Sequence, residues 1–285
     1  MKKLLTGLFL AVLVLALAAC GTAKKEDANS GETTKEPESK EENVTLTVGA
    51  SNVPHAVILE KVKPILEKEG IELKVETYQD YVLPNQDLSN GDIDANYFQH
   101  IPYFNTQIAD NGYEFANVGG VHIEPIGVYS KKYKSLEELP EGATILLSNS
   151  VADHGRMLSL LEAKGLIKLK DGVDKTKAEL KDVIENPKNF NFDANTAAEM
   201  LVQMYNNDEG DAVLINSNFA IDNGLNPIED SIALEDKESP YVNILAVRAG
   251  DETKPEIQKL YEALKSPEIQ DFILKEWKGA VVPVK

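Results

Sequence analysis

Cysteine is nearly absent from this chain, whose 285 residues include only Cys20. The four histidines show no His-x-x-x-His spacing, and no cysteine-based metal motif is present. The chain also lacks a Gly-x-Ser-x-Gly elbow, a His-Glu-x-x-His motif and a glycine-rich phosphate loop. These absences give catalysis no support, and we expect a protein that is not an enzyme and holds no cofactor or metal.

Positive charge is scarce, because 29 lysines and arginines face 47 aspartates and glutamates and leave a formal net charge of −18. An acidic surface repels nucleic acids and anionic lipids, so neither is an expected partner. The net charge does not argue against a small zwitterion, which responds to the local charges of its binding site.

One apolar run stands at the start of the chain, where Lys2 and Lys3 precede sixteen mostly apolar residues, Leu4 to Ala19. This run is shorter than the roughly 20 residues that span a bilayer. A short basic region, an apolar stretch and small residues are typical of a secretory signal. We predict that residues 1–19 are a signal peptide.

The end of this run, Leu17-Ala18-Ala19-Cys20, resembles a bacterial lipobox, in which the cysteine is acylated after cleavage. Two or more acyl chains, such as palmitate, hold a protein stably on a membrane. We predict a protein anchored by lipid at Cys20 to the cell membrane and facing away from the cytoplasm, with no thiol left for other chemistry. The alternative is an ordinary secretory signal with an incidental cysteine.

Residues 20–43 differ in composition from the rest of the chain. They combine lysines and acidic residues with Ser, Thr and Gly, and they contain no large apolar side chain. Such a segment cannot bury enough surface to offset its chain entropy. We expect a disordered polar tether behind the acylated cysteine.

The globular part begins with a strand, a helix and a second strand. Val44–Val48 and 71–77 alternate in polarity, as strands do. Between them, a helix is predicted from Pro54 to Gly70, with Ile58 and Val62 on its apolar face. This order predicts a βαβ unit of a parallel sheet.

Strands and helices continue to alternate over about 240 residues, which suggests two α/β lobes rather than one sheet. Ligands of such folds bind at the carboxyl ends of strands, often between domains. The further predicted elements are a helix near Leu88, strands at 127–129 and 144–147, a helix at 151–164, a helix at 196–205, strands at 212–215 and 241–248, and a helical region from Pro255 that is interrupted at Ser266-Pro267 and ends before Gly279.

Five aromatic or imidazole rings fall within 23 positions of one segment, which exceeds the need of one small strand or helix. Aromatic side chains combine a large apolar face with a polar group, and this suits a pocket for an apolar side chain beside a charged group. Pro84 and Pro102 are expected to break regular structure around them. The rings are Tyr81, Tyr97, Phe98, His100 and Tyr103.

Arg156 is predicted one turn into a helix that follows a buried strand. The amino end of that helix carries unpaired N–H groups and a partial positive charge. A guanidinium there would bind a carboxylate bidentately, and Asp153 would orient it or receive an ammonium. The alternative is a surface arginine paired with Asp153, which contributes only a few tenths of a kcal/mol.

The polar run Asn216-Ser217-Asn218 follows the buried strand at 212–215, and Asn243 lies in the next strand. Their amides can bond both an ammonium and a carboxylate, although Asn after a strand is often a turn former. A metal site made by His100, His122 and Glu124 is an alternative, because His122 and Glu124 alternate to one face of a predicted strand.

Four stretches together resemble the NlpA lipoprotein family, which includes the methionine-binding lipoproteins of ABC importers. The resemblance covers the chain from residue 44 onward and the lipobox. The stretches are Asp80–Tyr103, the predicted strand Val121–Lys131, Ile215–Ala220 with Gly224–Pro227, and Gly279–Pro283.

This resemblance implies a type II periplasmic-binding-protein fold, α/β and two-lobed, that closes on a ligand in the cleft between its lobes. Lobe 1 is then 44–124 plus 235–285, and lobe 2 is 125–234. It also implies a monomeric substrate-binding lipoprotein that passes L-methionine or a close relative to an ABC permease and its ATPase. The implied ligand-binding residues are Tyr81, Phe98, His100, Tyr103, Arg156, Asn218 and Asn243.

One departure from the family pattern bears on the ligand. The family usually has Asn-Asp-Pro-Thr-Asn where this chain reads Asn149-Ser150-Val151-Ala152-Asp153, so Asp153 replaces a common ligand contact. A carboxylate there favours an ammonium, and it disfavours a nearby carboxylate unless Arg156 bonds to it. Another small amino acid or a Met-containing dipeptide is therefore an alternative ligand. A metal-binding lipoprotein and a tethered enzyme or adhesin of the same fold are more remote alternatives.

Overall fold

The computed structural model describes residues 44–284, so the predicted signal peptide, Cys20 and the tether lie outside the described residues. The chain enters the fold through the predicted strand–helix–strand unit. Strand β1 (Val44–Ser51) pairs in parallel with β2 (Ile71–Tyr78) along their full length. Helix α1 (Val57–Glu67) joins them and buries Ile58 and Val62 against the sheet. The βαβ prediction is confirmed, although α1 begins after a π-helical turn at Asn52–Ala56 rather than at Pro54.

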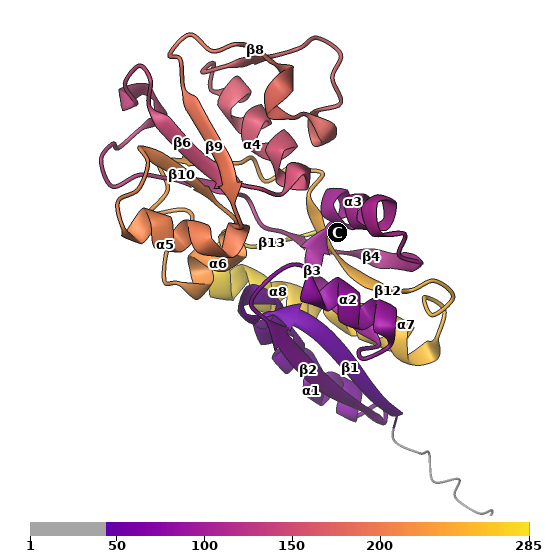
Figure 1. Ribbon diagram of the computed structural model, residues 1–285. Coiled ribbons are helices and arrows are strands. Elements are labelled where there is room, and N and C mark those ends of the chain that lie inside the picture. Colours follow the sequence, from indigo (N-terminus) through magenta and orange to yellow (C-terminus); the bar gives the residue numbers. More distant parts are fainter. Residues whose placement is uncertain (1–43, 285) are drawn as a thin grey trace, which may run out of the picture. The chain divides into compact units, whose positions relative to one another are not determined.

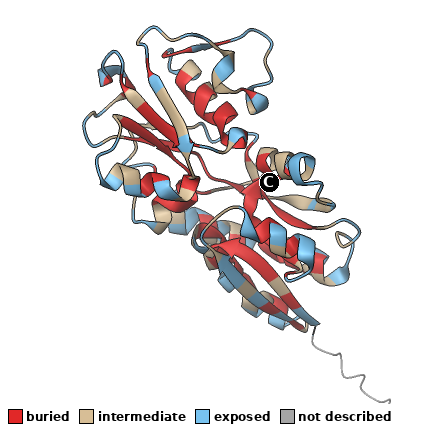
Figure 2. Ribbon diagram, in the orientation of Figure 1, coloured by how far each residue is buried: buried red, intermediate tan, exposed pale blue. Residues whose placement is uncertain are grey.

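A six-stranded sheet grows from this unit (Figure 1). Strand β1 also pairs in parallel with β3, whereas β12 is antiparallel to both β3 and β4. Central strand β3 is buried at every position, as Figure 2 shows. The spatial order is β13 (Val282–Pro283), β4 (Phe115–Ile123), β12 (Val242–Arg248), β3 (Ala95–His100), β1 and β2.

A second sheet has five strands and a core of its own. Its central strand β10 pairs in parallel with β6 and antiparallel with β5. Met157, Leu160 and Leu161 of α4 (Val151–Ala163), the helix predicted at 151–164, are buried in this core. The spatial order is β11 (Ala233–Leu234), β5 (Gly127–Tyr129), β10 (Ala212–Ile215), β6 (Thr144–Ser148) and β9 (Asn191–Thr196); a separate hairpin pairs β7 (Lys168–Leu169) with β8 (Val183–Glu185).

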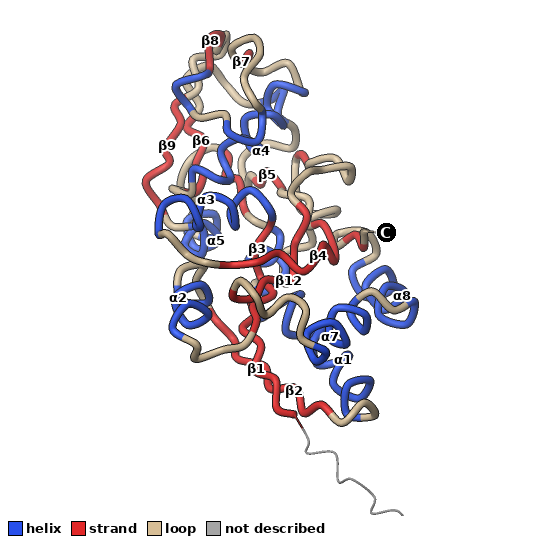
Figure 3. The backbone as a smooth tube through the Cα atoms, turned by 90° about the vertical axis from the view of Figure 1, so that its right-hand side faces the viewer, coloured by secondary structure: helices blue, strands red, loops and turns tan. Residues whose placement is uncertain are grey.

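The last two helices pack on the first sheet and not on the second. Figure 3 shows α7 and α8 beside α1, and their buried residues belong to the same core as β1 and β3. The predicted interruption at Ser266-Pro267 is confirmed. The helices besides α1 are α2 (Leu83–Asn90), α3 (Ile101–Asn111), α4 (Val151–Ala163), α5 (Leu201–Asn206), α6 (Ser217–Asp222), α7 (Pro255–Leu264) and α8 (Pro267–Trp277).

Three sequence predictions are wrong in detail. Thr196 ends strand β9, so the helix predicted at 196–205 begins as a 3₁₀ turn at Ala198 and becomes α5. The strand predicted at Val121–Lys131 is two strands in different sheets, because Pro125 has no N–H to continue a ladder. Pro84 and Pro102 do not break structure; each stands in the first turn of a helix, where no N–H is needed.

Within residues 44–284, every helix is too short or too polar to cross a membrane.

Candidate ligand-binding site

One cavity is lined by all eight side chains that were predicted to bind a ligand. The lining residues come from the parts of the fold built around each of the two sheets. Phe98 lies on β3 of the first sheet, and Arg156 lies on α4, which packs in the core of the second sheet. The eight residues are Tyr81, Phe98, His100, Tyr103, Asp153, Arg156, Asn218 and Asn243; Gln99, Glu124, Asn216 and Ser217 complete the lining. That these side chains contact a ligand stays a prediction.

Aromatic rings form one wall of the cavity. The rings of Tyr81 and Phe98 lie 6.0 Å apart, and Tyr103 lies 5.9 Å from Tyr81. The Tyr103 hydroxyl donates to the Tyr81 carbonyl (2.8 Å), and the Tyr81 hydroxyl donates to Asn218 Oδ1 (2.6 Å). Burial raises the pKa of Tyr81 well above its ordinary value, so its hydroxyl stays neutral. The wall therefore offers apolar ring surface whose polar groups are already hydrogen-bonded.

Arg156 is a buried member of the cavity and not a surface residue paired with Asp153, so that alternative is wrong. Its Nε donates to Glu235 (3.1 Å), and its Nη2 donates to Glu235 and to the Glu124 carbonyl (2.7 Å). Burial alone would lower the pKa of Arg156, but the charges of Glu235 and Asp153 outweigh it and raise that pKa. The guanidinium is thus held in place with its charge intact.

The ring of Tyr241 packs against the guanidinium of Arg156, beside a glycine of α4. The guanidinium carbon lies 4.7 Å from the centre of the Tyr241 ring, a cation–π distance. The neighbouring residue is Gly155, where a β-carbon would collide with the Lys175 carbonyl and lie 2.9 Å from the Tyr241 hydroxyl. Only glycine lets these groups pack against α4 at this point.

Asp153 faces the cavity and accepts hydrogen bonds from neutral groups. His100 Nε2 donates to its Oδ1 (3.0 Å), while Asn216 Nδ2 (3.1 Å) and Ser148 Oγ (3.3 Å) donate to its Oδ2. Burial would raise the pKa of Asp153, but the hydrogen bond from His100 and the charge of Arg156 lower it overall. Asp153 is therefore a buried, ionised carboxylate at the edge of the cavity.

The amide side chains of the cavity have partners from both sheets. Asn243, on β12, accepts from His55 Nε2 (3.1 Å), and Asn218 lies in the first turn of α6. Asn216, which precedes α6, donates to Asp153. The Asn216-Ser217-Asn218 run therefore builds the polar end of the cavity rather than serving as a turn alone.

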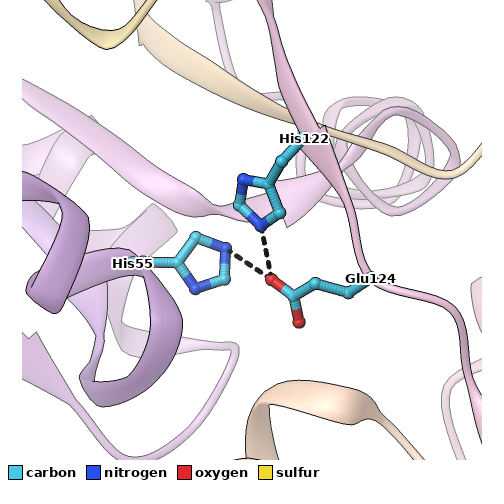
Figure 4. Close-up of side chains that lie close together, drawn as sticks. All are labelled: His55, His122 and Glu124. Atoms are coloured by element: carbon cyan, nitrogen blue, oxygen red, sulfur yellow. Dashed lines mark hydrogen bonds and ion pairs between the residues drawn. The ribbon is translucent and has the colours of Figure 1, made fainter. Parts of the chain in front are cut away.

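A second buried cluster lies beside the cavity and consists of His55, His122 and Glu124 (Figure 4). His122 Nε2 donates to Glu124 Oε1 (2.7 Å), and His55 Nε2 lies 3.1 Å from the same oxygen. The Tyr97 hydroxyl donates to His122 Nδ1 (2.5 Å). Burial lowers the pKa of His55 to about 4 and that of His122 to about 3, and burial raises the pKa of Glu124. Both histidines are consequently neutral near pH 7.

This cluster corrects the predicted metal alternative. Among residues 44–284, the group whose donor atoms lie within 4.8 Å of one another contains His55 in place of His100. Glu124 lies just past the end of β4, but its side chain faces the same side as that of His122, as predicted, since the two hydrogen-bond at 2.7 Å. His55 was missed since it stands in the π-helical turn after β1, where no periodicity marks it.

Sequence reasoning also missed Glu235 and Tyr241 as residues that position the site. Glu235 and Tyr241 flank the connection between β11 and β12, a segment without a motif. The sequence marks these two residues only by their type, because an acid can pair with the buried Arg156 and an aromatic ring can pack against it.

Comparisons with known proteins identify the family of this chain. The NlpA lipoprotein family model matches residues 46–285. The methionine-binding lipoprotein MetQ of Bacillus subtilis is 47% identical over 286 residues, which cover 100% of this chain and 99% of that protein. A lipoprotein of the YaeC family from Enterococcus faecalis, described as a pheromone cOB1 precursor, is 57% identical; it superposes with a TM-score of 0.82 over 84% of this chain and 100% of its own.

A nutrient-binding protein of Burkholderia cenocepacia, solved with bound methionine, is 41% identical and superposes with a TM-score of 0.79. That match covers 84% of this chain and 100% of the solved chain. The predicted mixed α/β architecture with two sheets is confirmed by these superpositions. The chain belongs to the NlpA lipoprotein family, and curated relatives of it are named as methionine-binding lipoproteins.

Proposed function

We propose that this protein captures L-methionine or a closely related amino acid and delivers it to an ABC permease with its ATPase. The observation that carries the proposal is the cavity itself, which joins an ionised carboxylate, a guanidinium and an aromatic wall. The names of the relatives support it, since one is a methionine-binding lipoprotein and another holds methionine.

The cavity suits the parts of an amino acid. The side chain of the ligand packs against Tyr81, Phe98 and Tyr103, while Arg156 receives its carboxylate and Asp153 its ammonium. Burying about 100 Å² of apolar surface contributes only about 2.5 kcal/mol. Micromolar affinity needs about 8 kcal/mol. The polar end must therefore supply most of the binding free energy.

The two sheets support a closing motion. Buried residues of one core lie within 46–121 and 245–281, and those of another lie within 126–214. We assign lobe 1 to 44–124 plus 235–285 and lobe 2 to 125–234, with hinge segments before β5 and before β12. Closure would exclude water from the cavity and strengthen each charged interaction there.

Membrane attachment follows from the family and from the lipobox. The chain is a member of a lipoprotein family. Acylation at Cys20 would hold a monomer on the outer side of the cell membrane, beside the permease. Another small amino acid or a Met-containing dipeptide remains an alternative ligand.

Removal of Arg156 tests the function. In calorimetric titrations of refolded, ligand-free protein with L-methionine, we expect Arg156→Ala to lose about 2–4 kcal/mol of binding free energy, because the ligand carboxylate is left unpaired in a buried site. Arg248→Ala is the matched control, since Arg248 bonds the Leu88 and Ile93 carbonyls away from the cavity. Unchanged affinity in Arg156→Ala, with both variants folded by circular dichroism, would remove Arg156 from the site.

Metal binding is the second candidate, and the cluster of His55, His122 and Glu124 is the observation that favours it. Its hydrogen bonds already satisfy the nitrogen atoms that face Glu124. Elemental analysis of purified protein before and after chelation separates the candidates. A stoichiometric metal whose removal abolishes methionine binding would favour a metal-dependent function.

A further inference from the structure

We propose that Asp153 makes this cavity recognise the ammonium of its ligand by charge and leaves a free ligand carboxylate dispensable. The cavity would then accept amino acids whose carboxyl group is an amide, including the first residue of a short peptide, beside the free amino acid. This inference rests on the proposed function and names the ligand class of the same site.

The positive charge of the cavity is already matched by the protein. Both Nε and Nη2 of Arg156 donate to Glu235, and Ile126 N and Ser239 Oγ hold the carboxylate of Glu235 in that position. A ligand carboxylate must share Arg156 with this built-in carboxylate. The net gain from a free ligand carboxylate is smaller than at an arginine without such a partner.

The negative charge of Asp153 has no such match in contact with it. His100 Nδ1 accepts a hydrogen bond from the Tyr103 backbone N–H (3.1 Å), so its one ring proton is on Nε2 and the imidazole that faces Asp153 is neutral. The remaining donors are a hydroxyl and an amide, from Ser148 and Asn216. Three neutral hydrogen bonds hold the carboxylate without cancelling its charge.

Asp153 also keeps room for a ligand donor. A carboxylate has about four acceptor positions, and the described residues occupy three of them, one on Oδ1 and two on Oδ2. The side chain lines the cavity although only 2% of its surface is exposed. An ammonium is the group that fills the fourth position and matches the charge.

The charge count then favours a cation. Arg156 and Glu235 cancel, Asp153 contributes one negative charge, and Glu124 can add to it but not reduce it. A zwitterion leaves the closed cavity negative, whereas an amino acid amide leaves it neutral. Uncompensated buried charge is unfavourable, so the amide loses little or nothing relative to the free acid.

The test compares three compounds by calorimetry at pH 6.5, where an α-amino group with an ordinary pKa of about 7.7–8.0 is charged. They are L-methionine, L-methioninamide and N-acetyl-L-methionine, and the dipeptide Met-Gly separates peptides from simple amides. For the full-length protein, we expect methioninamide to bind within about threefold of methionine or more tightly. N-acetylmethionine should bind at least about tenfold more weakly, since it lacks the charged donor.

Two variants shift the charge of the cavity without changing its shape. Asp153→Asn and Glu235→Gln should each move the preference toward methionine over methioninamide by about tenfold or more. Asp171→Asn, in an exposed turn, makes the same change in net charge and should leave the ratio unaltered. Melting temperatures confirm that the variants are folded, and Glu235→Gln keeps the test decisive if Asp153→Asn is unstable.

A preference for methionine that is equal in the wild type, Asp153→Asn and Glu235→Gln contradicts the inference and leaves the proposed function intact. Failure of every methionine compound to bind the wild type contradicts the proposed function and the inference with it.

Discussion

Two buried clusters of this protein pair a histidine with a carboxylate, and they differ in whether the histidine lines the cavity. His100 donates to Asp153 at 3.0 Å on the cavity wall, and His122 donates to Glu124 at 2.7 Å in the neighbouring cluster. The pKa of Asp153 is lowered, whereas burial raises that of Glu124. A histidine–carboxylate pair thus holds an ionised carboxylate on the cavity wall in one place and joins buried segments of the fold in the other.

The two carboxylates also differ in the donors that surround them. His55 and His122 both point at one oxygen of Glu124 (Figure 4). His122 is fully buried and does not line the cavity, while His100 does. Substitutions at the two histidines should therefore separate folding from binding.

The largest effect is expected from His122→Ala. This change leaves the Tyr97 hydroxyl and Glu124 short of a buried partner, so the free energy of unfolding should fall by about 2–4 kcal/mol in urea denaturation. Methionine affinity should stay within about threefold. Tyr97→Phe, which removes only the hydrogen bond to His122, should cost about 1 kcal/mol. A loss of affinity without a loss of stability would put His122 in the binding site and break the comparison.

A smaller effect, on affinity instead, is expected from His100→Asn. Asparagine can still cap α3, whose first-turn N–H of Tyr103 bonds to His100, so unfolding should change by about 1 kcal/mol or less. Asp153 loses the donor that orients it, and methionine should bind about tenfold more weakly in calorimetry. Stability that falls while affinity holds would show that the two histidines have the same, structural role.

The third prediction is a pH dependence of stability. His55 and His122 have folded pKa values of about 4 and 3, below the ordinary 6.5, so the unfolded chain binds more protons between pH 6.5 and 4. The stability due to these two groups is fully present above pH 6.5 and is lost as pH falls through that window, at up to about 1.4 kcal/mol per pH unit for each histidine. The raised pKa of Glu124 makes stability increase as the pH falls, but Glu124 is a single group, whereas two histidines act in the other direction.

Urea denaturation at pH 7.5, 6.0 and 5.0 measures this decline. The His122→Ala variant lacks one of the two histidines and should show a shallower slope than the wild type. Equal slopes would mean that His122 is already protonated in the folded protein.

Local patterns predicted much of this fold because they report local burial. Alternation in Val44–Val48 and the helical spacing of Met157, Leu160 and Leu161 each describe one element packing on one face. Strand β3 was missed because it is buried on both faces and so shows no alternation. The predicted ligand-binding residues lie around one cavity, but the partners that position them were invisible.

Those partners are long-range, and spacing along the chain carries no record of them. Glu235 reaches Arg156 across 79 positions, and His55 reaches Asn243 across 188. Only the folded arrangement of distant segments brings each pair together. The chemistry of a single residue could be predicted from the sequence. Its state of charge could not, because it depends on neighbours that only the structure identifies.

The account depends on the orientation of one zwitterion, which a crystal structure of the protein grown with L-methionine would measure directly. We predict the ammonium within about 3 Å of an Asp153 oxygen, the carboxylate on the Arg156 side, and the thioether among Tyr81, Phe98 and Tyr103. A methionine bound outside this cavity, or turned so that its carboxylate meets Asp153, would contradict the account.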